Sequence, residues 1–170
     1  MRKIGAFLLL LFVIFSCGKS GNNNKTNKEK GSATKNEQDV MNEIEKKKEE
    51  IEKYNRYVEV YNNLGNMDRR IIRYFEEAGN EEKVRKVKGS FPVMHVNQGT
   101  IDNIKQNLSS KAKMDELDKA AKDMLPYIEE LKTLAEAMES YYEGKDFVSD
   151  NYAKAQELHT KFLAAVKKYS

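Results

Sequence analysis

The sequence has few of the residues from which cross-links and reactive sites are built. Cys17 is its only cysteine, so a disulfide within the chain is excluded. It has two histidines, and it contains no His-Glu-x-x-His motif, no Gly-x-Ser-x-Gly motif and no phosphate-binding glycine loop. Neighbouring carboxylates such as Glu49 and Glu50 diverge around a helix, which is typical of a solvated face. We therefore expect no enzyme, no metal site and no cofactor.

The sequence also lacks a large excess of either charge. Lysine and arginine total 30, and aspartate and glutamate total 27, which gives a formal net charge of +3. Arg2 and Lys3 lie at the extreme N-terminus, and without them 28 positive residues face 27 negative ones. A nucleic-acid surface needs a concentrated positive field. We therefore expect no nucleic-acid partner.

An apolar run long enough to span a membrane is missing as well. Ile4 to Phe15 spans 12 residues, about 18 Å as a helix, whereas a bilayer core is about 30 Å thick. The run follows the positive pair Arg2-Lys3, and this order is typical of an export signal. We assign residues 1–16 to a cleaved signal peptide.

The end of this segment matches bacterial lipoprotein processing. Small Ser16 precedes Cys17, and Ile14 occupies a position where an ordinary secretory signal prefers a small residue. In lipoproteins, a diacylglycerol is attached to such a cysteine and the cut falls just before it. We expect Cys17 to carry the lipid and to anchor the protein to the membrane. The alternative is an uncleaved signal anchor with a buried thiol.

A polar segment separates this anchor from the remainder of the chain. Residues 17–38 contain almost no apolar side chains after the cysteine, so they cannot bury enough surface to fold. As a flexible coil they reach roughly 25 Å. The second mature position carries Gly18, followed by Lys19, and no aspartate that would signal retention at the inner membrane. We expect a tether on the exported side, at the outer membrane or facing the periplasm.

From Val40 onward the apolar positions alternate between spacings of three and four, which predicts a helical heptad seam. The seam comprises Val40, Ile44, Lys47, Ile51, Tyr54, Val58 and Tyr61, then Leu64, Met67, Ile71, Tyr74 and Ala78. One spacing of three falls where four is due, near Gly65, and predicts local overwinding. We predict one helix from Asp39 to Ala78, ended by Gly79-Asn80, with a break at Gly65 as the alternative.

The second half of the chain predicts three more helices. Residues 81–97 form an irregular crossover, and Thr100 caps a short helix with Ile101, Ile104 and Leu108 inside. A second long helix carries the buried stripe Met114, Leu117, Ala121, Met124, Ile128, Leu131, Ala135, Met138 and Tyr142. Pro126 kinks it and Gly144 ends it.

Ser149 or Asp150 caps the last helix, whose stripe is Tyr152, Ala155, His159, Phe162, Val166 and Tyr169. No strand pattern is present. Residues 39–170 are therefore predicted to be an all-α domain. We expect an elongated antiparallel bundle of three main helices, with a short extra helix in the crossover.

Two groups of side chains are candidate binding sites. Lys83, Arg85, Lys86 and Lys88 form a basic patch for an anionic partner, unless they are the solvated face of a short helix with Val84 and Val87 inward. Aromatic residues on the seams could line a groove: Tyr54, Tyr57, Tyr61, Tyr142 and His159. Packing in the core is the alternative for the tyrosines. His159 is either a core histidine bonded to a neighbouring hydroxyl or carboxylate, or a metal ligand.

Several of these motifs occur together in one family. Tyr54-Asn55-Arg56-Tyr57-Val58 with Tyr61-Asn62 resembles the opening helix of the YiiG-like bacterial lipoproteins, a domain of unknown function. The second matching stretch is Tyr141 to Phe147 with Asp150-Asn151, Ala153-Lys154, Leu158-His159 and Leu163-Ala164-Ala165. The resemblance implies a helical envelope lipoprotein and supplies no catalytic residue. Members usually continue for further helices, so we expect a short member or one that completes its bundle with another copy.

Three functions are open on these grounds. We favour a non-enzymatic, membrane-tethered helical module that binds a protein partner or a second copy of itself. A surface adhesin, or a lipoprotein that binds a small ligand or glycan through the groove or the patch, is the first alternative. A metal-assisted hydrolase centred on His159 is the second.

Overall fold

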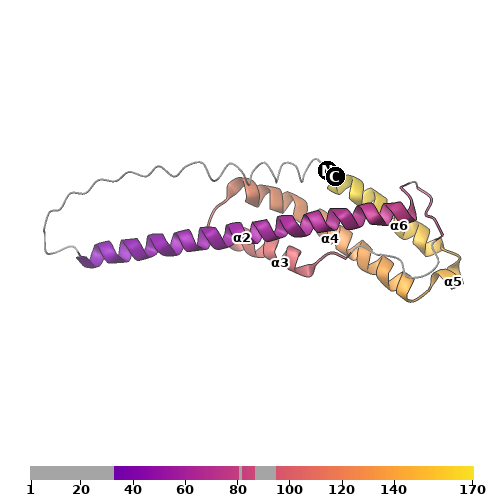
Figure 1. Ribbon diagram of the computed structural model, residues 1–170, viewed down its shortest axis with the longest axis horizontal. Coiled ribbons are helices and arrows are strands. Elements are labelled where there is room, and N and C mark those ends of the chain that lie inside the picture. Colours follow the sequence, from indigo (N-terminus) through magenta and orange to yellow (C-terminus); the bar gives the residue numbers. More distant parts are fainter. Residues whose placement is uncertain (1–32, 81, 87–94) are drawn as a thin grey trace.

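The computed structural model describes residues 33–80, 82–86 and 95–170 (Figure 1). Its elements, in chain order, are α2 (Ala33–Ala78), α3 (Gln98–Ser109), α4 (Asp115–Glu143), the single turn α5 (Phe147–Asp150) and α6 (Ala153–Tyr169). This confirms the all-α class, with three main helices and a short extra helix after the crossover. The predicted signal peptide, the lipidated Cys17 and most of the predicted tether lie outside the described residues.

α2 is a single helix of 46 residues, and it continues through Gly65 without a break. It begins six residues before the predicted start, inside the segment that we expected to be tether. The segment from Ala33 to Gln38 contains no glycine or proline and carries good helix formers, so the helix extends into it. The C-terminal end of α2 is as predicted: Gly79, directly after Ala78, has φ +89°, and its N–H donates to the Phe75 carbonyl.

The buried stripe of α2 differs from the predicted seam in its first half. The buried residues are Lys53, Tyr57, Val60, Leu64, Met67, Ile71, Tyr74 and Ala78, at regular spacings of four and three. The predicted overwinding was therefore wrong, because the stripe continues upstream through Val60 rather than through Tyr61. The apolar residues farther upstream belong to another face of the helix, and the bundle leaves that face exposed.

α3 and α4 follow the predicted stripes closely. Asn97, rather than Thr100, caps α3: its side chain accepts from the Gly99 N–H, while Thr100 is buried in the first turn. In α4 the predicted stripe is buried from Leu117 to Tyr142, and Met114 sits half-buried at the N-cap. Pro126 lies within the helix and does not end it, and Gly144 follows its last residue.

The corner between α4 and α6 depends on Asp150. Its carboxylate accepts from the Tyr152 and Lys154 N–H groups, each at 2.9 Å, and from the Tyr141 hydroxyl at 2.8 Å. Asn151 and Tyr152 have positive φ angles, so the chain reverses there before α6 begins. The N-cap residue of α6 is Tyr152 rather than the predicted Ser149 or Asp150, but Asp150 accepts from the Lys154 N–H in the first turn and so supplies the bond that a capping side chain would make.

The helices form an elongated bundle in which successive passes reverse direction (Figure 1). α3 returns along α2, so α4 runs in the same direction as α2, and α6 runs back. Contacts mark the register: Lys53 of α2 meets Asp118 at the start of α4, and Lys168 at the end of α6 meets Glu130. The N-terminal part of α2 extends beyond the bundle (Figure 1).

Candidate functional site

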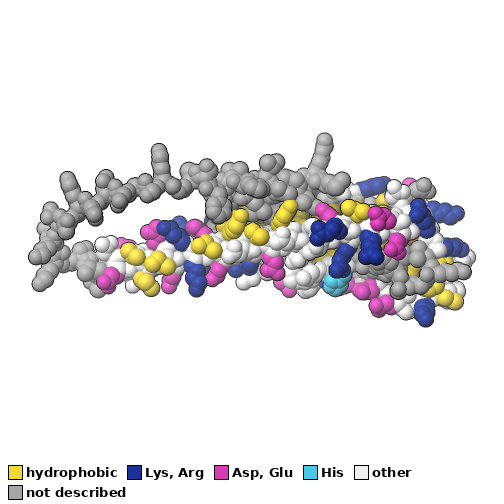
Figure 2. Space-filling model, viewed as in Figure 1, with side chains coloured by type: hydrophobic (Ala, Val, Ile, Leu, Met, Phe, Trp, Pro, Cys, Tyr) yellow, Lys and Arg dark blue, Asp and Glu magenta, His cyan; other side chains and the backbone are white. Residues whose placement is uncertain are grey.

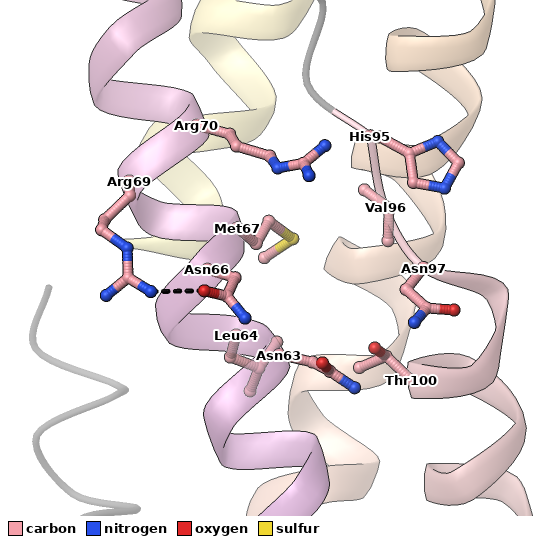
Figure 3. Close-up of a pocket in the computed structure, with 10 residues that line it drawn as sticks. All are labelled: Asn63, Leu64, Asn66, Met67, Arg69, Arg70, His95, Val96, Asn97 and Thr100. Carbon is pink, nitrogen blue, oxygen red and sulfur yellow. Dashed lines mark hydrogen bonds between the residues drawn. The ribbon is translucent and has the colours of Figure 1, made fainter.

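A pocket of about 520 Å³ lies between α2 and the start of α3 (Figure 3). Its polar lining residues are Asn63, Asn66, Arg69, Arg70, His95, Asn97 and Thr100, and its apolar ones are Leu64, Met67 and Val96. The three apolar side chains are buried, whereas both arginines and His95 are exposed. The pocket therefore has an apolar floor and a basic, amide-rich rim.

Two hydrogen bonds occupy side-chain oxygens of this pocket and leave the N–H groups of the same amides available. Asn66 Oδ1 accepts from the Arg69 guanidinium, and Asn97 Oδ1 accepts from the Gly99 N–H at 2.9 Å. In Figure 3 the amide nitrogen of Asn66 faces away from Arg69, and the Arg70 guanidinium extends toward the segment that carries His95. No aspartate or glutamate is among the described residues that line the pocket. The rim is thus rich in donors and positive charge.

The second candidate surface is the part of α2 before Glu49, which extends beyond the bundle. Its large apolar side chains are more than half exposed: Val40 52%, Met41 55% and Ile44 55%, continued by Ile51 at 61%. Figure 2 shows apolar side chains along this part of the helix, among side chains of both charges. We call Val40, Ile44 and Ile51 the apolar stripe. It is the upstream part of the predicted seam, and nothing in the described bundle covers it.

A polar cluster fastens α2 to the start of α4, and sequence reasoning missed it. Lys53 is 1% exposed, and its Nζ donates to the Ala112 carbonyl at 2.8 Å and lies 2.7 Å from Asp118 Oδ1. The Tyr57 hydroxyl donates to the same carboxylate at 2.6 Å. The available signal was spacing, because Lys53 stands four residues before Tyr57 on the stripe that continues to Val60.

The cluster changes the acidity of its members. Burial raises the pKa of Asp118, but hydrogen bonds from Lys53, Tyr57 and the Met114 N–H outweigh it and hold the pKa below the usual aspartate value. Burial, and then the bond to Asp118, raises the pKa of the Tyr57 hydroxyl well above its ordinary value. Asp118 is therefore an ionised acceptor at neutral pH, and it stabilises the bundle rather than exchanging protons.

The predicted basic patch lies on residues 82–86, the strap that follows α2, and two of its members, Arg85 and Lys86, are bonded to other parts of the chain. Arg85 donates to the Glu76 carbonyl at 3.2 Å. Lys86 donates to Asn151 Oδ1 at 2.7 Å and stands 5.5 Å from the centre of the Tyr152 ring. Lys83 is exposed, and Lys88 lies outside the described residues. Residues 82–86 are not helical, so the alternative of a short helix was wrong over this stretch.

The aromatic residues proposed for a groove do not converge. Tyr57 contacts Asp118 in the first turn of α4, whereas Tyr142 lies in its last turn, about 36 Å farther along the helix. Tyr54 and Tyr61 are half-buried on α2. His159 stands at the far end of the bundle, against α2's Tyr74. The three α2 tyrosines of this set therefore lie toward one end of the bundle, and Tyr142 and His159 lie toward the other.

His159 is a core histidine. It is 0% exposed, and its Nδ1 lies 2.7 Å from the hydroxyl of Tyr74. The hydroxyl that bonds this histidine thus belongs to α2 and not to the adjacent residue Thr160. The rings of Tyr74 and Phe75 on α2 lie 5.7 and 6.2 Å from the His159 ring, centroid to centroid, and both also pack against Phe162 of α6. Among the described residues, no group of three or more His, Cys, Asp or Glu side chains could hold a metal ion.

Within the described part of the chain, none of the helices is both long and apolar enough to cross a membrane.

Comparison with known proteins gives one match. The model of the family described as "Protein of unknown function (DUF3829)" matches residues 48–170, more than two thirds of the chain. No curated protein and no solved structure matches it significantly. The matched range begins at Lys48, next to Glu49, whose carboxylate accepts from Ser110 and so marks the start of the bundle. The whole bundle is thus the family's domain, and the chain belongs to this family of proteins of unknown function.

Proposed function

We propose that this protein is a lipid-anchored, non-enzymatic module of the bacterial cell envelope, which associates with a second copy of itself through the apolar stripe. Within its family, we place it with the YiiG-like lipoproteins that it resembles. The anchor is the lipid on Cys17, and the location is the exported side of the membrane. The exposed stripe on α2 is the observation that carries the proposal.

The anchor rests on the order of positive pair, apolar run, Ser16 and Cys17. Growth with labelled palmitate tests it: the chain should take up label and lose residues 1–16, and Cys17→Ser should abolish both. A wild-type chain that matures without label would contradict the lipid anchor. The Cys17→Ser chain lacking its signal, residues 17–170, then serves for work in solution.

The stripe needs a partner for physical reasons. Residues 36–48 form about 20 Å of helix whose side chains are exposed, and isolated helices shorter than about 12–15 residues are marginal in water. Covering Val40, Ile44 and Ile51 removes apolar side chains from water, at roughly 25 cal/mol per Å². Association therefore stabilises both the stripe and the helix that carries it.

The charges beside the stripe favour a second copy in parallel orientation. Ile44 and Ile51 occupy a positions of a heptad, and Val40 and Lys47 occupy d positions. Glu43 then falls at g and Lys48 at e of the following heptad, so a parallel pair brings opposite charges together. An antiparallel pair brings Glu43 against glutamates and Lys48 against lysine, which is unfavourable. Two chains anchored by their N-termini in one membrane also point the same way.

Lys47 limits the strength of this association. It occupies a d position between the isoleucines, and within one chain its ammonium group pairs with Glu43 at 2.9 Å. In a parallel pair two Lys47 side chains would approach one another at the seam, and a polar core residue lowers stability while it fixes the register. We therefore expect Lys47→Leu to strengthen association.

Sedimentation equilibrium of the Cys17→Ser chain tests the proposal. We expect a reversible dimer, weakened by Glu43→Lys or Lys48→Glu, restored by both changes together, and tightened by Lys47→Leu. Glu45→Lys, at the outward b position, is the matched control for charge. Circular dichroism checks that helix content is kept. A chain that stays monomeric at every concentration, or a double variant no better than the single ones, would contradict the proposal.

A further inference from the structure

We propose that the pocket between α2 and α3 binds a small organic anion. The charged group, a carboxylate or a phosphate, lies at the rim between Arg70 and Asn66. The apolar body of the ligand rests on Leu64, Met67 and Val96 (Figure 3). This site is independent of the apolar stripe, which lies farther upstream on α2, between residues 40 and 51.

The rim favours an anion because it offers several donors, while two of its amide oxygens are already occupied. The bond from Arg69 occupies Asn66 Oδ1, and it turns the amide N–H groups of Asn66 away from Arg69 (Figure 3). Asn97 Oδ1 is occupied by the Gly99 N–H. Asn63 and Thr100 add further groups that can donate. Asn63 and Thr100 can also accept, but an anion meets donors on several sides of the pocket.

Charge points to the same ligand class. Arg70 has no ion-pair or hydrogen-bond partner among the described residues, and its exposed guanidinium extends over the pocket (Figure 3). Arg69 holds a second positive charge at the rim through its bond to Asn66. The 12-residue helix α3 also begins at this pocket, so the positive end of its dipole faces the same space. No carboxylate from the described lining residues offsets these charges.

The floor argues for an organic rather than an inorganic anion. Leu64, Met67 and Val96 are 1%, 4% and 4% exposed and form an apolar surface below the donors. A volume of about 520 Å³ falls within the usual range for small-molecule sites. Inorganic phosphate would use the rim alone, whereas an anion with a short alkyl body would use both parts.

Four probes separate these contributions: hexanoate, hexyl phosphate, 1-hexanol and inorganic phosphate. Each is titrated into the Cys17→Ser chain, residues 17–170, and followed by ¹H–¹⁵N NMR. We expect hexanoate and hexyl phosphate to shift the amide signals of Asn63, Asn66 and Thr100, and to bind more tightly than the other two. Preference for one of the two hexyl anions identifies the charged group.

Two arginine variants on α2 complete the test. Arg70→Gln should weaken hexanoate binding at least tenfold, because a bond to a charged group is worth more than the roughly 1.4 kcal/mol that corresponds to a factor of ten. Arg73→Gln, outside the pocket, should bind as the parent does. Hexanol binding as tightly as hexanoate, inorganic phosphate as tightly as hexyl phosphate, no binding by any probe, or equal loss in both variants would each overturn the proposal.

Discussion

The Nζ atom of Lys53 lies 2.7 Å from Oδ1 of Asp118, and this ion pair joins the middle of α2 to the first turn of α4. The lysine side chain is 1% exposed and the aspartate side chain 20% exposed. The pair stands where the bundle begins, because upstream of it the side chains of α2 are largely exposed. It therefore lies close to the start of the family's domain, which is matched from residue 48, and directly after the apolar stripe, whose last residue is Ile51.

Removal of this lysine should destabilise the bundle strongly. Lys53→Met leaves the Asp118 carboxylate without its charged partner and the Ala112 carbonyl without its donor. We expect the free energy of unfolding in urea to fall by about 3 kcal/mol, the usual cost of breaking a buried pair. Lys46→Met, on the exposed part of α2, is the matched control and should change it by less than about 0.5 kcal/mol. Equal effects from the two variants would contradict the role given to Lys53.

The same carboxylate predicts a loss of stability in acid. Its pKa is lowered in the folded protein, so its contribution is present above the unfolded value, about 3.9, and is lost as the pH falls through the lower folded value. Unfolding measured from pH 7 to pH 2 should show this decline below about pH 4. Asp118→Asn should remove that part of the decline, whereas Asp123→Asn, on the exposed face of α4, should keep it. Parallel pH profiles for both variants would exclude Asp118 as its source.

The bond between Tyr74 and His159 predicts a stabilising role for the tyrosine hydroxyl. Both residues are buried, and the hydroxyl lies 2.7 Å from Nδ1. Tyr74→Phe keeps the ring contacts and removes this bond, so we expect a loss of about 1–3 kcal/mol in thermal or urea unfolding. Tyr54→Phe, half-buried on the same helix, is the control for loss of a hydroxyl. Unchanged stability of Tyr74→Phe would show that the core histidine does not depend on it.

Substitution by alanine should change the stability of the protein in opposite directions at Gly65, inside α2, and at Gly79, directly after it. Gly65 lies inside α2 with nothing within 4 Å of an added Cβ, so Gly65→Ala should raise stability by about 0.5–1 kcal/mol. Gly79 has φ +89°, a conformation that favours glycine, so Gly79→Ala should lower stability by about 1–2 kcal/mol. Urea unfolding of the two variants measures both signs, and a loss at Gly65 would mean that the helix bends or breaks there after all.

Periodicity predicted the fold well where one stripe faces one core. In α4 the predicted residues from Leu117 to Tyr142 are buried, and Gly144 follows the helix as expected. In α2 two stripes share one helix, and the apolar residues before Glu49 led the prediction onto the face that is exposed. A buried lysine on the other face concealed the true register, since Lys53 reads as a surface residue until Asp118 is placed beside it.

The candidate sites were harder to predict because they depend on residues distant in sequence. The pocket combines Asn66 and Arg70 of α2 with His95 and Thr100, and neither set forms a recognisable motif. The run of basic residues 83–86 is visible in the sequence. The bonds from Arg85 to the Glu76 carbonyl and from Lys86 to Asn151 depend on the path of this segment over the bundle, which the sequence does not reveal. The tyrosines were visible too, and only the register of the helices shows that they lie at opposite ends.

Oxidative cross-linking at the apolar stripe tests the central claim most directly. Ile44→Cys, introduced into the Cys17→Ser chain, places one thiol at an a position of the proposed parallel pair, where the two copies face one another. Asn42→Cys, at the outward f position, is the control. Under mild oxidation, non-reducing gels should show a covalent dimer for Ile44→Cys and little for Asn42→Cys. Equal cross-linking of the two variants, or none in either, would contradict a parallel dimer through the stripe.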